Sequence, residues 1–108
     1  MTGRSDLLEA IRAAVRRREY RLTLHGFREA TADRISVSDI ESAIIGGAAE
    51  IIEDYPDDPR GASCLILGVT EAGRAIHVVV SYPPHVAVIT VYTPDPERWA
   101  DNRMRRQS

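Results

Sequence analysis

The chain has 108 residues, enough for one domain and too few for two. Apolar residues make up 44% and charged residues 28%, which excludes a disordered chain, and the net charge of −2 lacks the basic excess typical of general nucleic-acid binders. With one cysteine, no apolar run of signal-peptide length and no span for a bilayer, we expect a single soluble domain in the reducing cytoplasm.

The first third of the chain has the apolar spacing of helices. Residues 5–18 predict a helix that Ser5 can cap, with apolar residues recurring every three or four positions. Residues 20–24 alternate in the way a short strand does, and residues 25–33 predict a second helix. The helices therefore precede most of the strands.

A third helix follows, and its start has two alternatives. Ser36 can cap it, whereas Ser38 and Glu41 form a competing capping box two residues later. Gly46 and Gly47 predict its end, because glycine tolerates the positive φ that commonly terminates a helix.

The second half of the chain changes to the period of strands. Short connections at residues 71–74 and 83–85 require neighbouring strands to run antiparallel. The predicted fold class is α+β, with N-terminal helices packed on an antiparallel sheet of three to four strands. The strands are expected at residues 50–54, 63–70, 75–82 and 86–92.

The organisation expected from these elements has three parts. Residues 1–19 form an N-terminal helix, residues 20–99 the α+β domain, and residues 100–108 a polar basic tail that frays. A short helix is predicted around residues 96–102, at the junction of the domain and the tail.

Two histidines are the first candidates for chemistry. His25 precedes a predicted helix, where it can act as a general base, bind an anion or cap the helix locally, and Arg28 shares its helical face. His77 alternates with Ile76 and Val78 along a strand. It lies either on an open sheet face suited to a shallow cleft or in the core as a structural histidine, and both faces carry apolar residues.

Other candidates are weaker. Cys64 precedes an apolar run and is best interpreted as a small buried hydrophobe rather than as a nucleophile. The histidines and Cys64 match no metal-ligand spacing, so we expect no metal and no cofactor. The acidic residues between positions 50 and 58 either protect an exposed edge strand or dock a basic partner.

Several segments together resemble the domain-of-unknown-function 4258 family. The likeness runs from about residue 20 to residue 99 and is spread over the chain. The segments that carry it are YRLTLH at residues 20–25, ISVSDIE at 35–41, EIIEDYPDD at 50–58, CLILG at 64–68, HVVV at 77–80 and ITVY at 89–92.

The resemblance implies a compact sheet packed on N-terminal helices and a relationship to RelE/ParE-like and BrnT-like bacterial toxins. It implies a ribonuclease, ribosome-dependent or free, or a relative that has lost that activity. The chain departs from the family's pattern at Glu29 and Asp33, where arginines are common. Arg28 and Arg34 lie one residue away, which turns a helical side chain by about 100°.

The first functional hypothesis is an RNase-type toxin that acts on mRNA. RNA cleavage needs a base, an acid and cations that stabilise the phosphorane charge. We assign His25 and His77 as the acid/base pair, Arg28 and Arg74 as charge stabilisers, and Tyr92 as an orienting or stacking group. Its partners would be RNA or the ribosome, together with a cognate antitoxin.

The alternative hypothesis is a non-catalytic protein-interaction module with a toxin-like fold. It would bind a protein through the acidic region or an open sheet face, and the near-neutral charge favours it. A third hypothesis is a small-molecule or metal-dependent enzyme around His25 and His77. No membrane partner is expected, and a homodimer through a sheet edge is compatible with either of the first two hypotheses.

Overall fold

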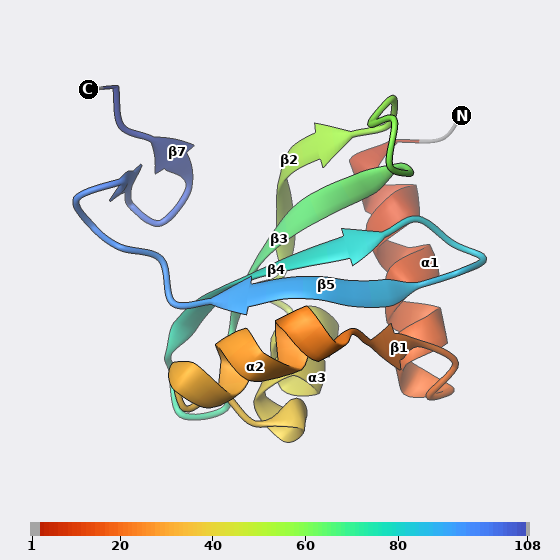
Figure 1. Ribbon diagram of the computed structural model, residues 1–108, viewed down its shortest axis with the longest axis horizontal. Coiled ribbons are helices and arrows are strands. Elements are labelled where there is room, and N and C mark those ends of the chain that lie inside the picture. Colours follow the sequence, from red (N-terminus) through yellow and green to blue (C-terminus); the bar gives the residue numbers. More distant parts are fainter. Residues whose placement is uncertain (1–2, 108) are drawn as a thin grey trace.

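The computed structural model describes residues 3–107, in which three helices pack on a mixed five-stranded sheet (Figure 1). The strand order is β1-β5-β4-β3-β2, and a separate two-stranded hairpin follows the sheet. The helices are α1 (Arg4–Arg16), α2 (Leu24–Ala32) and α3 (Val37–Ile45). The strands are β1 (Arg21–Leu22), β2 (Glu50–Tyr55), β3 (Ser63–Val69), β4 (Ala75–Ser81), β5 (Ala87–Tyr92), β6 (Trp99–Ala100) and β7 (Met104–Arg105).

The helix α1 forms where the apolar spacing predicts it, but Ser5 does not cap it. Gly3 occupies the cap position and makes no side-chain bond there. Arg12, on the buried side of this helix, donates from Nε to the carbonyl of Ile44 at 3.0 Å and from Nη2 to that of Gly46 at 2.6 Å. Because the last carbonyls of a helix lack intrahelical partners, Arg12 satisfies the end of α3.

The start of α3 is set by Ser36 rather than by Ser38. The Ser36 hydroxyl accepts from the Asp39 amide at 3.0 Å, and the Asp39 carboxylate accepts from the Ser36 amide at 2.9 Å. The expected positive φ at the other end is wrong, since Gly46 has φ −61° and ψ 155°. Glycine is needed there for space, because a Cβ atom would lie 2.9 Å from the Ser42 carbonyl oxygen.

The predicted antiparallel sheet of three to four strands is wrong in one respect. Strands β2 to β5 are antiparallel neighbours, but β1 joins the sheet as a fifth strand, parallel to β5, with Arg21 opposite Ala87. Short connections dictated the antiparallel pairs, whereas α2, α3 and three strands separate β1 from β5 in the chain. The hairpin rule therefore does not apply to this pair.

The two faces of the sheet have different coverings. The inner face carries Ile66, Ile76, Val78 and Val80, which join the core with residues of α1 and α3. The outer face, as we call it, carries the alternate residues, which include Leu65, Leu67, His77, Val79 and Tyr92.

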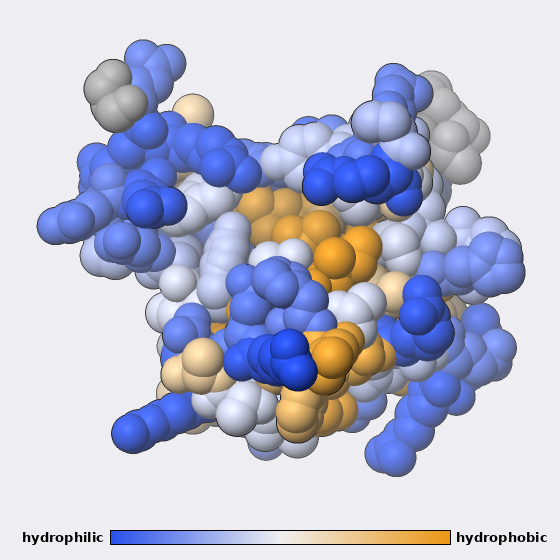
Figure 2. Space-filling model, viewed as in Figure 1, coloured by the Kyte–Doolittle hydropathy of each residue, from blue (hydrophilic) through white to orange (hydrophobic). Residues whose placement is uncertain are grey.

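The C-terminal hairpin (residues 99–105) differs from the predicted short helix and frayed tail. It consists of β6 and β7, with Trp99 opposite Arg105, and Trp99 is buried. Figure 1 shows the chain running from the end of β5 through a loop into this hairpin. In the same view, Figure 2 shows an apolar patch over the middle of the sheet with hydrophilic surface on both sides.

None of the helices in the described part of the chain is long and apolar enough to cross a membrane.

Candidate functional site

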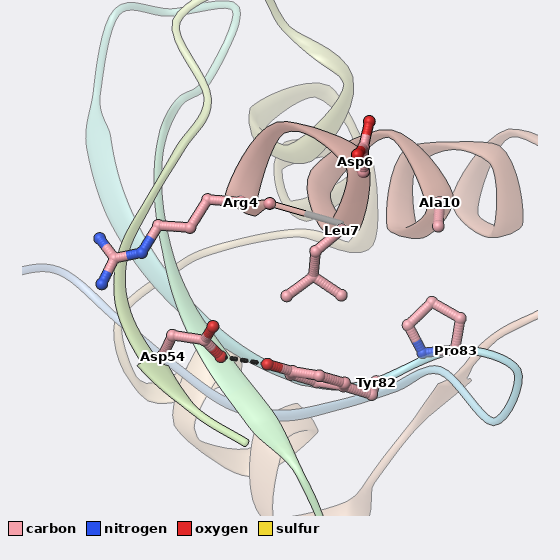
Figure 3. Close-up of a pocket in the computed structure, with 8 residues that line it drawn as sticks. Arg4, Asp6, Leu7, Ala10, Asp54, Tyr82 and Pro83 are labelled. Atoms are coloured by element: carbon pink, nitrogen blue, oxygen red, sulfur yellow. Dashed lines mark hydrogen bonds between the residues drawn. The ribbon is translucent and has the colours of Figure 1, made fainter. Parts of the chain in front are cut away.

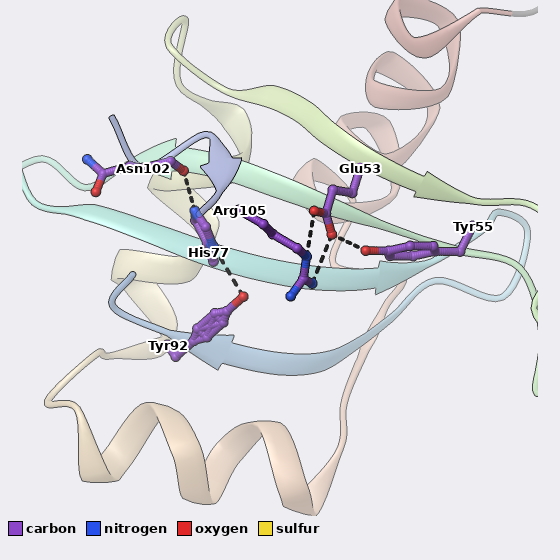
Figure 4. Close-up of polar contacts among 6 residues, drawn as sticks. All are labelled: Glu53, Tyr55, His77, Tyr92, Asn102 and Arg105. Atoms are coloured by element: carbon purple, nitrogen blue, oxygen red, sulfur yellow. Dashed lines mark hydrogen bonds and ion pairs between the residues drawn. The ribbon is translucent and has the colours of Figure 1, made fainter. Parts of the chain in front are cut away.

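His77 and Tyr92 are the two predicted site residues that the fold brings together. They lie opposite each other on β4 and β5, with the Tyr92 hydroxyl 3.2 Å from Nδ1 of His77 (Figure 4). The other ring nitrogen, Nε2, lies 2.6 Å from the backbone carbonyl oxygen of Asn102. Since a carbonyl only accepts, Nε2 carries the proton and Nδ1 accepts from Tyr92. Both nitrogens of His77 are thus engaged.

The Asn102 carbonyl reaches His77 because of a tight turn. Asp101 and Asn102 have φ values of 51° and 62°, and the amide of Arg103 donates to the carbonyl of Ala100 at 2.9 Å. Asn and Asp adopt this left-handed conformation more readily than other non-glycine residues. The Asp-Asn pair therefore sets the geometry of the hairpin that covers His77.

Trp99 completes the covering of the imidazole. Its ring stands edge-on to that of His77, with the centroids 4.5 Å apart and the planes at 88°. The Tyr92 ring lies 5.2 Å from the His77 ring on another side. As a result His77 is 0% exposed although it lies on the outer face. Both sequence-based alternatives are partly realised, because the residue is outside the helix-packed core and still buried.

An arginine–glutamate pair ties the hairpin to β2. Arg105 donates from Nε to Glu53 Oε2 at 2.8 Å and from Nη2 to Oε1 at 3.0 Å, and its guanidinium lies 4.7 Å from the Trp99 ring centroid. Tyr55 donates to the same carboxylate. Burial alone would raise the pKa of Glu53, but these hydrogen bonds and the Arg105 charge hold it below its ordinary value.

A second ion pair joins Arg103 to Glu50. Residues three apart on a regular strand point to opposite faces, but β2 has a bulge between Ile51 and Glu53. The bulge places Glu50 opposite Leu67 and Glu53 opposite Leu65, so both carboxylates lie on the outer face. There they meet two arginines spaced two residues apart on the hairpin.

The environment of His77 makes stability depend on pH. Burial lowers the pKa of His77 below its ordinary value of 6.5, against the opposing effects of the Asn102 hydrogen bond and the Glu53 charge. The unfolded chain therefore binds a proton at a higher pH than the folded chain does. His77 contributes stability above about pH 6.5, and this contribution is lost as the pH falls towards its lowered pKa.

We accordingly expect the urea concentration at the unfolding midpoint of the wild type to decrease as the pH is lowered below about 6.5. His77→Gln should flatten the curve below about pH 6.5, because it removes the buried imidazole. Equal slopes for the wild type and His77→Gln would contradict the assignment.

Comparison with known proteins assigns the chain to a protein family. Residues 22–93, which are 72 of the 108 residues, match the model of a domain of unknown function, DUF4258. The chain belongs to the DUF4258 family. Neither the curated proteins nor the solved structures gave a match. His77, Tyr92, Glu53 and Tyr55 fall inside the matched DUF4258 region, whereas the C-terminal hairpin follows it.

Two of the predicted site residues lie elsewhere in the DUF4258 domain. His25, on α2, is exposed, and its Nε2 lies 3.3 Å from the Glu29 carboxylate. Arg28 is also exposed, and its side chain makes no hydrogen bond or ion pair within residues 3–107. No contact joins either residue to His77 in the described part of the chain, so the predicted acid/base pair does not share a site.

Arg74 has a structural role at the end of α2. Its guanidinium donates to the carbonyls of Asp33 and Arg34, the latter at 3.0 Å, and to the Thr93 hydroxyl at 2.6 Å. Three acceptors already surround this guanidinium, so the predicted charge stabiliser is committed to joining α2, β4 and the end of β5.

A polar pocket of about 370 Å³ lies beside Tyr92 and Trp99, the two residues whose rings contact His77. Tyr92 and Trp99 form part of its wall, with Arg98 and Arg105 as its cations. Sequence reasoning missed Trp99, Asn102 and Arg105 as site residues, and it singled out Glu53 only as part of the acidic stretch. The Asp-Asn turn signal before an arginine-rich strand was the available clue.

Another pocket, of about 520 Å³, lies away from His77, between α1, the strand β2 and the residues that follow β4 (Figure 3). Leu7 and Tyr82 line it, and the Tyr82 hydroxyl donates to Asp54. Burial, followed by this hydrogen bond, raises the pKa of Tyr82 to about 12. Cys64 is fully buried, and burial together with the Asp54 charge raises the pKa of its thiol to about 12. This thiol is therefore a poor nucleophile.

Three carboxylates of the acidic stretch pair with arginines of the same chain. Glu50 pairs with Arg103, Glu53 with Arg105 and Asp58 with Arg60. No group of three or more metal-ligating side chains is present among the residues that the structure describes. Two of the arginines that contact this region, Arg103 and Arg105, belong to the C-terminal hairpin.

Proposed function

We propose that this DUF4258 protein is a non-catalytic protein-interaction module that binds its partner through the outer face of the sheet. The observation that carries the proposal is the occupation of His77 by polypeptide. One ring nitrogen donates to a backbone carbonyl, the other accepts from Tyr92, and Trp99 covers the ring. With both ring nitrogens engaged in hydrogen bonds, His77 serves to bind the C-terminal hairpin.

The arrangement of the other candidates supports binding over catalysis. General acid–base chemistry requires a group within hydrogen-bond reach of the proton that it moves. His77 is buried beneath the C-terminal hairpin, and His25 is on the exposed surface of α2. Arg74 is occupied by three acceptors, so the cations assigned to the phosphorane are not free to act together.

The outer face also offers room for a partner. A pocket of about 440 Å³ has Val79 and Ile89 as its apolar residues, with Tyr55 and Arg60 among its polar ones. Mixed apolar and polar lining of this kind suits a protein segment. A cognate antitoxin or another protein would fit this description of the partner.

The test is growth after induced expression of the wild type beside His77→Ala and Arg28→Ala, at matched protein levels. RNA integrity is followed in the same cultures and with purified protein, with and without ribosomes. We expect unaffected growth and intact RNA for all three proteins. Growth arrest with RNA cleavage that His77→Ala loses and Arg28→Ala keeps would contradict the proposal.

The second candidate function is an RNase-type toxin acting on mRNA. The observation in its favour is the polar pocket, where Tyr92 lies beside Arg98 and Arg105 and in contact with His77. Arginines and a tyrosine can bind phosphate and stack on a base. This candidate requires the hairpin to leave His77 before any proton transfer, and the growth experiment separates it from the first.

A further inference from the structure

The C-terminal hairpin is attached to the sheet almost entirely through side chains. Strands β6 and β7 pair only with each other, so no ladder of backbone hydrogen bonds joins them to the five-stranded sheet. The contacts are the Arg103 and Arg105 ion pairs, the Trp99 ring on His77, and the Asn102 carbonyl on Nε2. The hairpin also lies after residue 93, where the DUF4258 match ends.

The sheet provides a surface complementary to this hairpin. We define the cradle as Glu50, Glu53, His77 and Tyr92. The bulge in β2 brings its two carboxylates to one face, where they match arginines spaced two residues apart. His77 supplies both a ring for an aromatic side chain and an N–H for a backbone carbonyl. All of these features belong to the matched family region.

We propose that the cradle is a binding site for a partner-protein strand that carries two arginines spaced two residues apart and an aromatic side chain. The C-terminal hairpin occupies this site as an intramolecular competitor. The inference rests on the proposed function, for which it specifies the chemistry of the partner.

The contacts are of a kind that a competitor can displace. The side chains of the Arg103–Glu50 pair are 51% and 47% exposed, and ion pairs between exposed side chains contribute little individually. The hairpin remains bound to the cradle because a short linker keeps it at an effective concentration on the order of millimolar. To displace the hairpin, a partner strand needs a ratio of its concentration to its dissociation constant that is larger than the corresponding ratio for the tethered hairpin.

The experiment uses two full-length variants with opposite charge changes, Glu53→Arg and Arg105→Glu. Trp99 is the chain's single tryptophan, so its emission and its quenching by acrylamide report hairpin docking. Each variant alone should be a monomer with an accessible Trp99. Their equimolar mixture should regain a protected Trp99 at twice the monomer mass, because each cradle then receives the other copy's hairpin. The reference is the double variant Glu53→Arg/Arg105→Glu. Its hairpin should dock on the cradle of the same chain, so it should be a monomer with a protected Trp99.

A second measurement covers the case in which Glu53→Arg does not fold. A labelled peptide of residues 94–107 is titrated into the full-length Arg105→Glu variant, and anisotropy follows binding. We expect saturable binding, at least tenfold weaker to the wild type, whose own hairpin competes. A peptide with Gln in place of both Arg103 and Arg105 should bind at least tenfold more weakly to the variant.

Two results would overturn the proposal. One is a mixture that stays at monomer mass with an accessible Trp99 while the reference chain is closed. The other is a peptide that binds the wild type and Arg105→Glu equally or not at all. Neither result bears on growth or RNA integrity, so failure of this inference is distinguishable from failure of the proposed function.

Discussion

Gly68→Ala is expected to lower the free energy of unfolding by about 3 kcal/mol. Gly68 lies on β3 where α3 crosses the inner face of the sheet. A Cβ atom there would lie 2.8 Å from both the carbonyl carbon and the Cβ of Ala43, and closer still to the Ala43 carbonyl oxygen. Helix backbone cannot yield as a flexible side chain can, so α3 would have to move away from the sheet.

Urea denaturation of Gly68→Ala beside Gly47→Ala measures this effect. Gly47 is the matched control, because a Cβ atom added there would have no neighbouring atom within 4 Å. Its change in stability should stay within about 0.5 kcal/mol. Similar stabilities for the two variants would show that α3 does not approach β3 as closely as described.

Arg74→Ala is expected to cost about 2 kcal/mol of stability. The substitution removes the donor to the carbonyls of Asp33 and Arg34 and to the Thr93 hydroxyl. Hydrogen bonds from a charged donor contribute about 1.5–3 kcal/mol each when their acceptors are buried, and these acceptors are partly solvated. The effect should therefore be smaller than the sum of three such bonds.

Arg28→Ala is the control for Arg74→Ala, because Arg28 is exposed and has no hydrogen-bond or ion-pair partner among the described residues. Thermal unfolding should place Arg28→Ala within about 0.5 kcal/mol of the wild type. An Arg74→Ala variant as stable as Arg28→Ala would contradict the structural role of Arg74.

Local patterns predicted the elements because short-range physics determines them. The apolar spacing of α1, the Ser36 cap and the short connections between β3, β4 and β5 depend on residues close in sequence. The parallel pairing of β1 with β5 does not. It depends on how α2 packs along β5, where a Cβ atom added to Gly26 would lie 3.0 Å from the Val88 carbonyl oxygen.

The site was less predictable because it combines residues far apart in the chain. Alternation could not decide the face of His77, since both faces of β4 are apolar. The decisive element is the hairpin around Asp101 and Asn102. In the sequence, the arginines of this segment are typical of a solvated tail. The partners of these arginines, Glu50 and Glu53, share a face only because of the β2 bulge, which has no reliable sequence signal.

Nitrogen-15 NMR of the His77 ring tests the central claim most directly. Held beneath the hairpin, the imidazole should show a single neutral tautomer protonated at Nε2, slow exchange of that proton with water, and a pKa below 6.5. The Arg105→Glu variant should lose the slow exchange. A wild-type His77 that titrates near 6.5 with rapid proton exchange would contradict the account, because the ring would then be open to solvent and free to act as an acid or a base.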